Sequence, residues 1–364
     1  MSARASDERV APTSLLTALM RRPEMGAVSG ALLVFLLFFL VASPSMFSAR
    51  GVVNWLTVSG QLGVIAVSQC LLMIAGEFDL SVGSMIGFSG MVMALLFRFA
   101  DLPAWAAIFS GFAICLCLGM LIGVIRVKSG LSSFIVTLAF LFILRGATIV
   151  SARVLNGSTL VGGMRDAKQT DPLAWLFGGQ FGQGVFSWLA EHGMLAKLPN
   201  GTPTVTGLPM IILWCLVLGA AAALVLANSR FGNWIFSAGG DPRAAAVVGV
   251  PVGRVKIRLF VYSAFCASVF GAAQVFEYGS ADASRGELKE FESIIAAVIG
   301  GALLTGGYGS VIGALVGALI FGVVSQGFFY TGVDGDWFRI FLGCVLLGAV
   351  AFNTQLRKRV TGGY

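Results

Sequence analysis

Long apolar runs separated by charged residues repeat along the whole chain. A helix that crosses a bilayer needs about 20 apolar residues, and a charged side chain at mid-depth costs roughly 2.5–3.5 kcal/mol or more. Charges in this pattern therefore mark the ends of membrane-spanning helices. The charge-free windows are 25–49, 51–76, 80–97, 102–125, 129–144, 198–229, 259–276, 293–333 and 340–356.

The pattern predicts ten membrane-spanning helices, and so an all-α polytopic membrane protein. The fifth window continues past Arg145 to about residue 151, and the window 293–333 can hold two helices with a tight turn between them. The first of these two, 293–304, has a length that is typical of a re-entrant segment. We predict that it crosses, because the basic tail 357–359 would otherwise lie outside the cell, against the positive-inside rule.

The distribution of Lys and Arg among the short loops predicts that both termini are cytoplasmic. The expected organisation is a cytoplasmic N-terminal segment, 1–24, a single transmembrane domain, 25–356, and a cytoplasmic tail, 357–364. Within the domain, residues 152–207 form a long periplasmic loop and residues 228–254 form a cytoplasmic loop.

Composition agrees with this class of protein. Hydrophobic residues make up 57% of the chain and charged residues 11%, whereas a soluble domain carries about 25% charged residues. Loop charges that set the topology explain the net charge of +7, so we expect no nucleic-acid partner. The six cysteines lie in apolar runs, which favours packing over disulfides. The single histidine, His192, lies in a polar loop, so we expect no catalytic residue and no metal site.

The segment 76–83 places two carboxylates, Glu77 and Asp79, between two predicted spans. One interpretation is a pathway or gating element built on broken helices. The other is a plain cytoplasmic turn in which Asp79 or Ser81 caps the next helix. We hypothesise that both carboxylates cap and stabilise the break between the two helices and that they do not carry protons.

Residues 239–251 predict a short helix in the cytoplasmic loop, with Asp241 as its N-cap and Gly249 at its end. So short a helix is not stable alone in water and needs a surface to pack on. It is either a coupling helix that inserts into a partner or a loop helix packed on its own protein. The candidate coupling residues are Asp241, Pro242, Arg243, Ala244, Ala245, Ala246 and Gly249.

The chain contains two further motifs. They are residues 132–138, and residues 295–310 with a tight turn at Gly306, Gly307 and Gly309. Together the four motifs resemble those of the permease subunits of bacterial ABC importers for ribose, xylose and similar monosaccharides. The resemblance covers roughly residues 50–353. The first motif of that family is Gly-Gly-Ile-Asp-Leu-Ser-Val-Gly.

The chain departs from the family pattern at four places. Glu77 replaces the second glycine of the first motif, Ser133 stands where proline is usual, and Val247 stands near a usual arginine. The loop 152–207 is also long for the family. These departures concern the identity of the sugar more than the class of protein.

The resemblance implies a transmembrane permease domain that forms an alternating-access pathway for a monosaccharide or related polyol, in the bacterial inner membrane. It also implies four partners of this chain: a second permease copy, a cytoplasmic ATP-binding cassette ATPase, a periplasmic sugar-binding protein and membrane lipid. The chain has no G-x-x-x-x-G-K-[ST] phosphate-binding motif, so we expect ATP and magnesium on the ATPase and no cofactor on this chain. The pathway and gating candidates are Glu77, Asp79, Ser81, Gln61, Gln69, Thr137, Gln274 and Tyr278.

Two alternatives remain open at this point. The first is an ABC permease for a branched-chain amino acid or a nucleoside, and a zwitterionic cargo would favour a fixed charge pair in its path. The second is an ion-coupled secondary transporter, for which the coupling charges would be Glu77, Asp79, Arg145 and Glu277.

Overall fold

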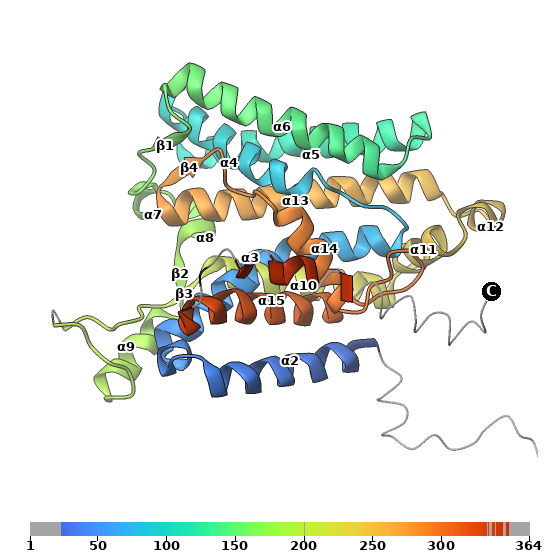
Figure 1. Cartoon of the computed structure of the whole chain (residues 1–364). Coiled ribbons are helices and arrows are strands. Elements are labelled where there is room, and N and C mark those ends of the chain that lie inside the picture. Colours follow the sequence, from blue (N-terminus) through green and yellow to red (C-terminus); the bar gives the residue numbers. More distant parts are fainter. Residues whose placement is uncertain are drawn as a thin grey trace, which may run out of the picture.

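The computed structural model describes residues 23–199, 201–332, 334, 337–338, 340–344 and 347–348. In this part of the chain, seven helices are long and apolar enough to cross a membrane (Figure 1). They are α3 (Ala49–Ile74), α4 (Val82–Phe99), α5 (Ala104–Ser129), α6 (Ser133–Asn156), α10 (Met210–Asn228), α13 (Val252–Tyr278) and α15 (Val311–Thr331). The prediction of an all-α polytopic membrane protein is confirmed.

A further helix, α2 (Pro23–Val41), contains a shorter apolar stretch, Ala27–Val41. The count of ten spans, the domain boundaries and the side of each terminus stay predictions. Most of the predicted N-terminal segment 1–24, the end of the last predicted span and the tail 357–364 lie outside the described residues.

Short elements lie at the two ends of the bundle (Figure 1). One end, called here the α9 end, carries η1 (Pro44–Phe47), β1 (Leu160–Gly162), α7 (Ala167–Thr170), α8 (Pro172–Gly178), β2 (Gln180–Phe181), α9 (Gln183–Glu191), β3 (Leu208–Pro209) and β4 (Ser280–Asp282). Strand β1 pairs antiparallel with β4, and β2 with β3. The opposite end, the α12 end, carries α11 (Arg230–Gly240) and α12 (Pro242–Val247).

Several helices differ in extent from the charge-free windows. Helix α10 begins at Met210 and not at residue 198, because Pro199, Pro203 and Pro209 exclude a regular helix before it. Helix α13 begins at Val252, before three basic residues that the window pattern placed in a loop. Charges mark helix ends only approximately, since a paired or partly exposed cation can lie inside a helix.

The window 293–333 divides into α14 (Lys289–Ile299) and α15. Helix α14 has 11 residues, a length of roughly 16 Å and about half of a hydrocarbon core of roughly 30 Å. It packs closely on α15, since a Cβ on Gly313 would lie 2.0 Å from the carbonyl oxygen of Gly300. Full crossing by residues 293–304 stays a prediction.

Helices α3 and α13 form the centre of the bundle and are the most buried of the seven candidate spans. Helix α5 approaches α13 through small residues, because a Cβ on Gly119 would lie 2.6 Å from the Cβ of Ala264. The segment between α3 and α4 contacts α13 through hydrogen bonds from Lys256 to Glu77 and from Ser263 to Asp79.

Candidate functional site

The predicted short helix is present as α12, which begins directly after Asp241. The carboxylate Oδ1 of Asp241 accepts hydrogen bonds from the backbone N–H groups of Arg243 and Ala244, at 2.9 and 3.0 Å. This is the N-cap geometry of a helix with proline in its first turn. Gly249 has a φ of 88°, in the left-handed region that ends helices.

The side chains of α12 and its C-cap divide between the protein's own surface and solvent. Ala245 is only 5% exposed and packs on its own chain, whereas Val247 and Val248 are 87% and 79% exposed. The sequence did not separate Ala245 from its neighbours, and the structure places it outside the exposed surface. Val247 and Val248 are therefore two neighbouring aliphatic side chains left exposed at the α12 end.

Helix α11, which the sequence did not predict, ends in backbone contact with two other motifs. A Cβ on Gly239 would lie 1.8 Å from the carbonyl oxygen of Ile74 and 2.8 Å from the nitrogen of Gly307. Gly306, with a φ of 83°, lies against Gly76. The motifs 76–83, 239–251 and 295–310 therefore meet at one point, where a side chain has no room. This point is called here the glycine junction.

Glu77 is buried beside the glycine junction and binds two cations. Its Oε1 accepts a hydrogen bond from Nζ of Lys256 at 2.5 Å, and its Oε2 accepts one from Nε of Arg126 at 2.8 Å. Arg126 lies in the last turn of α5 and Lys256 in the first turns of α13, so the carboxylate joins both helices to the break after α3. Both oxygens of Glu77 contact cationic side chains, and the hypothesis that Glu77 also caps α4 stays a prediction.

Ser133 contacts the same break from α6. Its Oγ accepts a hydrogen bond from the backbone N–H of Phe78 at 3.1 Å. The proline that is usual in the resembling family has no hydroxyl and could not accept this bond. Two of the departures noted in the sequence, Glu77 and Ser133, therefore add polar contacts to the break, at the side chain of Glu77 and at the backbone N–H of Phe78.

Asp79 is buried and accepts hydrogen bonds on both carboxylate oxygens. Oδ1 accepts from the backbone N–H and the Oγ–H of Ser81, at 2.9 and 2.5 Å, and Oδ2 accepts from the Oγ–H of Ser263 at 2.7 Å. The side-chain amide of Gln69 donates to the carbonyl oxygen of Asp79. Burial raises the pKa of the Asp79 carboxyl, and the hydrogen bonds from Ser263 and Ser81 oppose this shift. Asp79 thus connects the break between α3 and α4 to α13.

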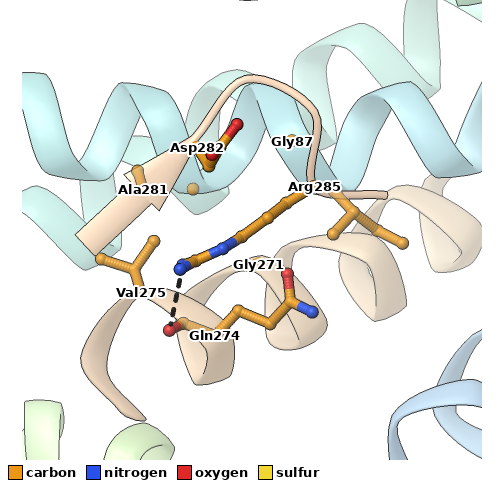
Figure 2. Close-up of a pocket in the computed structure, with 9 residues that line it drawn as sticks. Gly87, Gly271, Gln274, Val275, Ala281, Asp282 and Arg285 are labelled. Carbon is orange, nitrogen blue, oxygen red and sulfur yellow. Dashed lines mark hydrogen bonds between the residues drawn. The ribbon is translucent and has the colours of Figure 1, made fainter. Parts of the chain in front are cut away.

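Three other pathway candidates gather toward the α9 end. The guanidinium of Arg285 lies 5.0 Å from the centre of the Tyr278 ring, and the side-chain nitrogen Nε2 of Gln61 is buried without a hydrogen-bond partner among the described residues. Figure 2 shows Arg285 donating to the carbonyl oxygen of Gln274, at 3.4 Å. Gln274 and Arg285 line a cavity of about 10 Å³, enough for about one water molecule.

Thr137 and the charges of the ion-coupled alternative do not add to the residues around Asp79 or to those around Tyr278. The Thr137 hydroxyl donates to the carbonyl oxygen of Ser133 within α6, at 2.8 Å. The charges of the ion-coupled alternative are dispersed, since Arg145 pairs with Glu287, away from Glu77 and Asp79. In the described part of the chain, no group of His, Cys, Asp or Glu side chains could hold a metal ion.

Sequence reasoning missed the partners of the two buried carboxylates, Arg126, Lys256 and Ser263. The basic residues were assigned to cytoplasmic loops, which placed them on the same side as Glu77 without identifying the contact. A buried carboxylate requires a cation or several hydrogen-bond donors, and this requirement is the signal that points to nearby loop cations.

Known proteins resemble the chain over most of its length. Residues 51–350 match the family described as branched-chain amino acid transport system / permease component. The chain is 31% identical over 325 residues to the ribose import permease protein of Escherichia coli (strain K12), covering 89% of this chain and 92% of the relative. It is 29% identical over 324 residues to the fructose import permease protein of Rhizobium meliloti, covering 88% and 82%. It is 28% identical over 359 residues to the xylose transport system permease protein of Haemophilus influenzae, covering 91% and 96%.

The bundle of candidate spans, with its short exposed helix at one end, defines a polytopic membrane transport protein. The chain belongs to the branched-chain amino acid transport system / permease component family.

Proposed function

We propose that this chain is the transmembrane permease subunit of an ABC importer in the bacterial inner membrane. In this proposal it forms the alternating-access pathway for a monosaccharide or related polyol, which a periplasmic binding protein delivers. The observation that carries the proposal is the glycine junction, because it connects the exposed helix α12 to α3 and α15. A helix that receives movement from a partner must be fixed to the helices that it displaces.

ATP hydrolysis takes place on a separate ATPase chain, which contacts the permease through Val247 and Val248. Closure of the ATPase displaces α12, and α11 transmits this displacement to Gly239. The direct contacts of Gly239 with Ile74 and Gly307 then move the end of α3 and the turn before α15 together. A second permease copy completes the pathway, and this chain binds no cofactor of its own.

The names of the relatives and the chemistry of the candidate residues support the proposed cargo. The relatives described above are named for ribose, fructose and xylose. A neutral sugar is bound by hydrogen-bonding groups and aromatic faces, and Gln61, Gln274 and Tyr278 are groups of this kind. The name of the family favours a branched-chain amino acid as the second candidate cargo.

Reconstitution tests the proposal. The chain is inserted into liposomes with its ATPase, and the binding protein is loaded with each sugar that a ligand screen identifies. We expect uptake of a monosaccharide that requires both the binding protein and internal ATP. Uptake of leucine or a nucleoside in place of sugar would establish the alternative cargo. Uptake driven by a proton gradient without ATP would establish the ion-coupled alternative.

A further inference from the structure

An exposed ion pair joins Arg145, at the middle of the candidate membrane-spanning helix α6, to Glu287. Nη1 of Arg145, on α6, lies 3.2 Å from Oε1 of Glu287. Their side chains are 27% and 56% exposed, respectively. Most polar side chains inside a bundle of this kind are enclosed, as Glu77 and Asp79 are, so the exposure of this pair requires an explanation.

The depth of the pair follows from the length of α6. Arg145 is almost equally far from Ser133 and Asn156, the two ends of α6, at roughly 17 Å along the axis from either one. Because the hydrocarbon core is roughly 30 Å thick, this position is near its centre. Glu287 must reach the same depth, since it contacts Arg145.

The loop that carries Glu287 enters the bundle between β4 and α14. A Cβ on Gly286 would lie 2.1 Å from the carbonyl oxygen of Gly83, in the first turn of α4, so the two backbones are in contact. The carbonyl oxygen of Arg285 lies similarly close to Gly87. Helix α14 begins only two residues after Glu287, and its length of about half the hydrocarbon core agrees with a start at mid-depth.

Hydrocarbon cannot be the surroundings of this pair. Ionisable side chains at bilayer mid-depth face the interior of a bundle or a water-filled cavity, because exposure to lipid tails is too costly. The surface beside Arg145 is also open, since Gly146 has no other atom within 4 Å of its Cβ position. Phe291, in the first turn of α14, is a further exposed side chain of this segment. A guanidinium donor beside a carboxylate acceptor is a combination that binds a polyhydroxylated molecule.

We propose that Arg145 and Glu287 line the aqueous translocation pathway and form a transient subsite for the hydroxyl groups of a neutral polyol. This inference rests on the proposed function and names the site at which that function takes place. The guanidinium donates hydrogen bonds to hydroxyl oxygens, and the carboxylate accepts them from hydroxyl protons. Because the two charges neutralise each other, the subsite favours no net charge on the cargo. Its exposure to water keeps binding weak enough for release, which conduction requires.

The first experiment measures access of water to the site. Gly146→Cys is prepared with Cys117 and Cys344, the two exposed native cysteines, replaced by serine. The matched control is Val217→Cys, because Val217 is an exposed side chain inside the charge-free helix α10. A charged, membrane-impermeant methanethiosulfonate is added to the complete importer in nanodiscs, without nucleotide and again with ATP and vanadate. We expect modification at residue 146 to be about tenfold faster or more than at residue 217 in at least one state. Equal, slow modification at both residues in both states would overturn the proposal.

The second experiment tests recognition of hydroxyl groups. Glu287→Gln keeps the size of the side chain but removes the charged acceptor, and we expect the maximal sugar uptake rate to fall about tenfold. Assembly of the complex, measured by co-purification of the ATPase, should stay unchanged. A purely structural role would slow all cargoes equally, whereas a subsite predicts that deoxy analogues of the sugar are slowed less than the sugar itself. Equal slowing, or no slowing, contradicts the subsite.

The two experiments separate this inference from the proposed function. If the wild-type importer takes up leucine and no sugar, the proposed cargo is wrong, and with it the polyol subsite. Fast modification at residue 146 would still show a water-filled pathway at the ion pair. If sugar uptake is normal and residue 146 is inaccessible, the function stands and the position of the pathway is wrong.

Discussion

The backbone N–H of Gly307 donates a hydrogen bond to the carbonyl oxygen of Ile74 at 2.8 Å. This bond fixes the turn before α15 to the last residue of α3, and Gly239 lies against both partners. Backbone-to-backbone contact of this kind leaves no flexible side chain between the segments. A displacement of one segment therefore has to move the other two, and this property distinguishes the glycine junction from ordinary helix packing.

Gly239→Ala tests this relationship. The added Cβ would lie 1.8 Å from the carbonyl oxygen of Ile74, so the backbone must move apart. Overpacking costs about 1–3 kcal/mol, and we expect ATP-driven uptake to fall about tenfold or more. Gly240→Ala is the matched control, because nothing lies within 4 Å of that Cβ position. Equal uptake by the two variants would show that the junction does not transmit movement.

A second prediction concerns the exposed valines of the α12 segment. Val247→Arg or Val248→Arg puts a charge on the surface that we assign to the ATPase, whereas Val247→Ala removes bulk without adding charge. Burying an unpaired charge is far costlier than losing a few methyl groups, so the Arg variants should lose ATPase binding and uptake while the Ala variant keeps most of both. Co-purification of the ATPase with the permease and vesicle uptake measure the two effects. Retained ATPase binding by both Arg variants would contradict the docking surface.

Local signals made α12 predictable, and non-local contacts made the rest of the site unpredictable. Asp241 and Gly249 determine where α12 begins and ends through bonds to adjacent backbone, which a sequence shows directly. The approach of Gly239 to Ile74 depends on how distant helices pack, and no local pattern encodes it. The use of charges as helix boundaries also concealed Lys256, because a paired cation can lie inside the first turns of α13.

The membrane orientation gives a third prediction. Arg165 at the α9 end and Arg243 at the α12 end are both exposed, so a cysteine at either position is accessible to a labelling reagent. With both termini cytoplasmic, an impermeant maleimide added to intact spheroplasts should label Arg165→Cys and not Arg243→Cys. Permeabilised spheroplasts should show labelling of both and serve as the control. The reverse pattern would overturn the predicted orientation, though not the fold.

A fourth prediction concerns Glu77, whose carboxylate is the partner of two cations. Glu77→Gly gives this chain the glycine that is usual in the resembling family, but it leaves the buried Lys256 without a counter-charge. Removing one member of a buried pair costs about 3–5 kcal/mol, and we expect the lower part of this range because Arg126 retains contact with solvent. The thermal unfolding midpoint of the purified protein should fall accordingly. Addition of Lys256→Met should restore most of it, and a double variant no more stable than Glu77→Gly would rule out the charge as the cause.

The last prediction separates a structural role of Asp79 from a proton-carrying one. The Asp79 carboxylate accepts hydrogen bonds from Ser81 and Ser263, and so holds the start of α4 against α13. Asparagine keeps one oxygen acceptor for Ser81, and its amide can donate to the Ser263 oxygen, so Asp79→Asn should keep most uptake.

Alanine removes every one of these bonds, and Asp79→Ala should cost about 0.5–2 kcal/mol of stability and much of the activity. Because burial raises the pKa of this carboxyl, the folded state favours its protonated form relative to the unfolded state. The free energy of unfolding should therefore fall as the pH rises through the folded-state pKa, because the buried carboxyl then ionises. The asparagine variant has no carboxyl at this position and should lack this dependence. Vesicle uptake with internal ATP, measured across pH for the three proteins, distinguishes the roles. If Asp79→Asn is as inactive as Asp79→Ala, acceptor geometry is not what the site requires, and a titrating carboxyl becomes the better explanation.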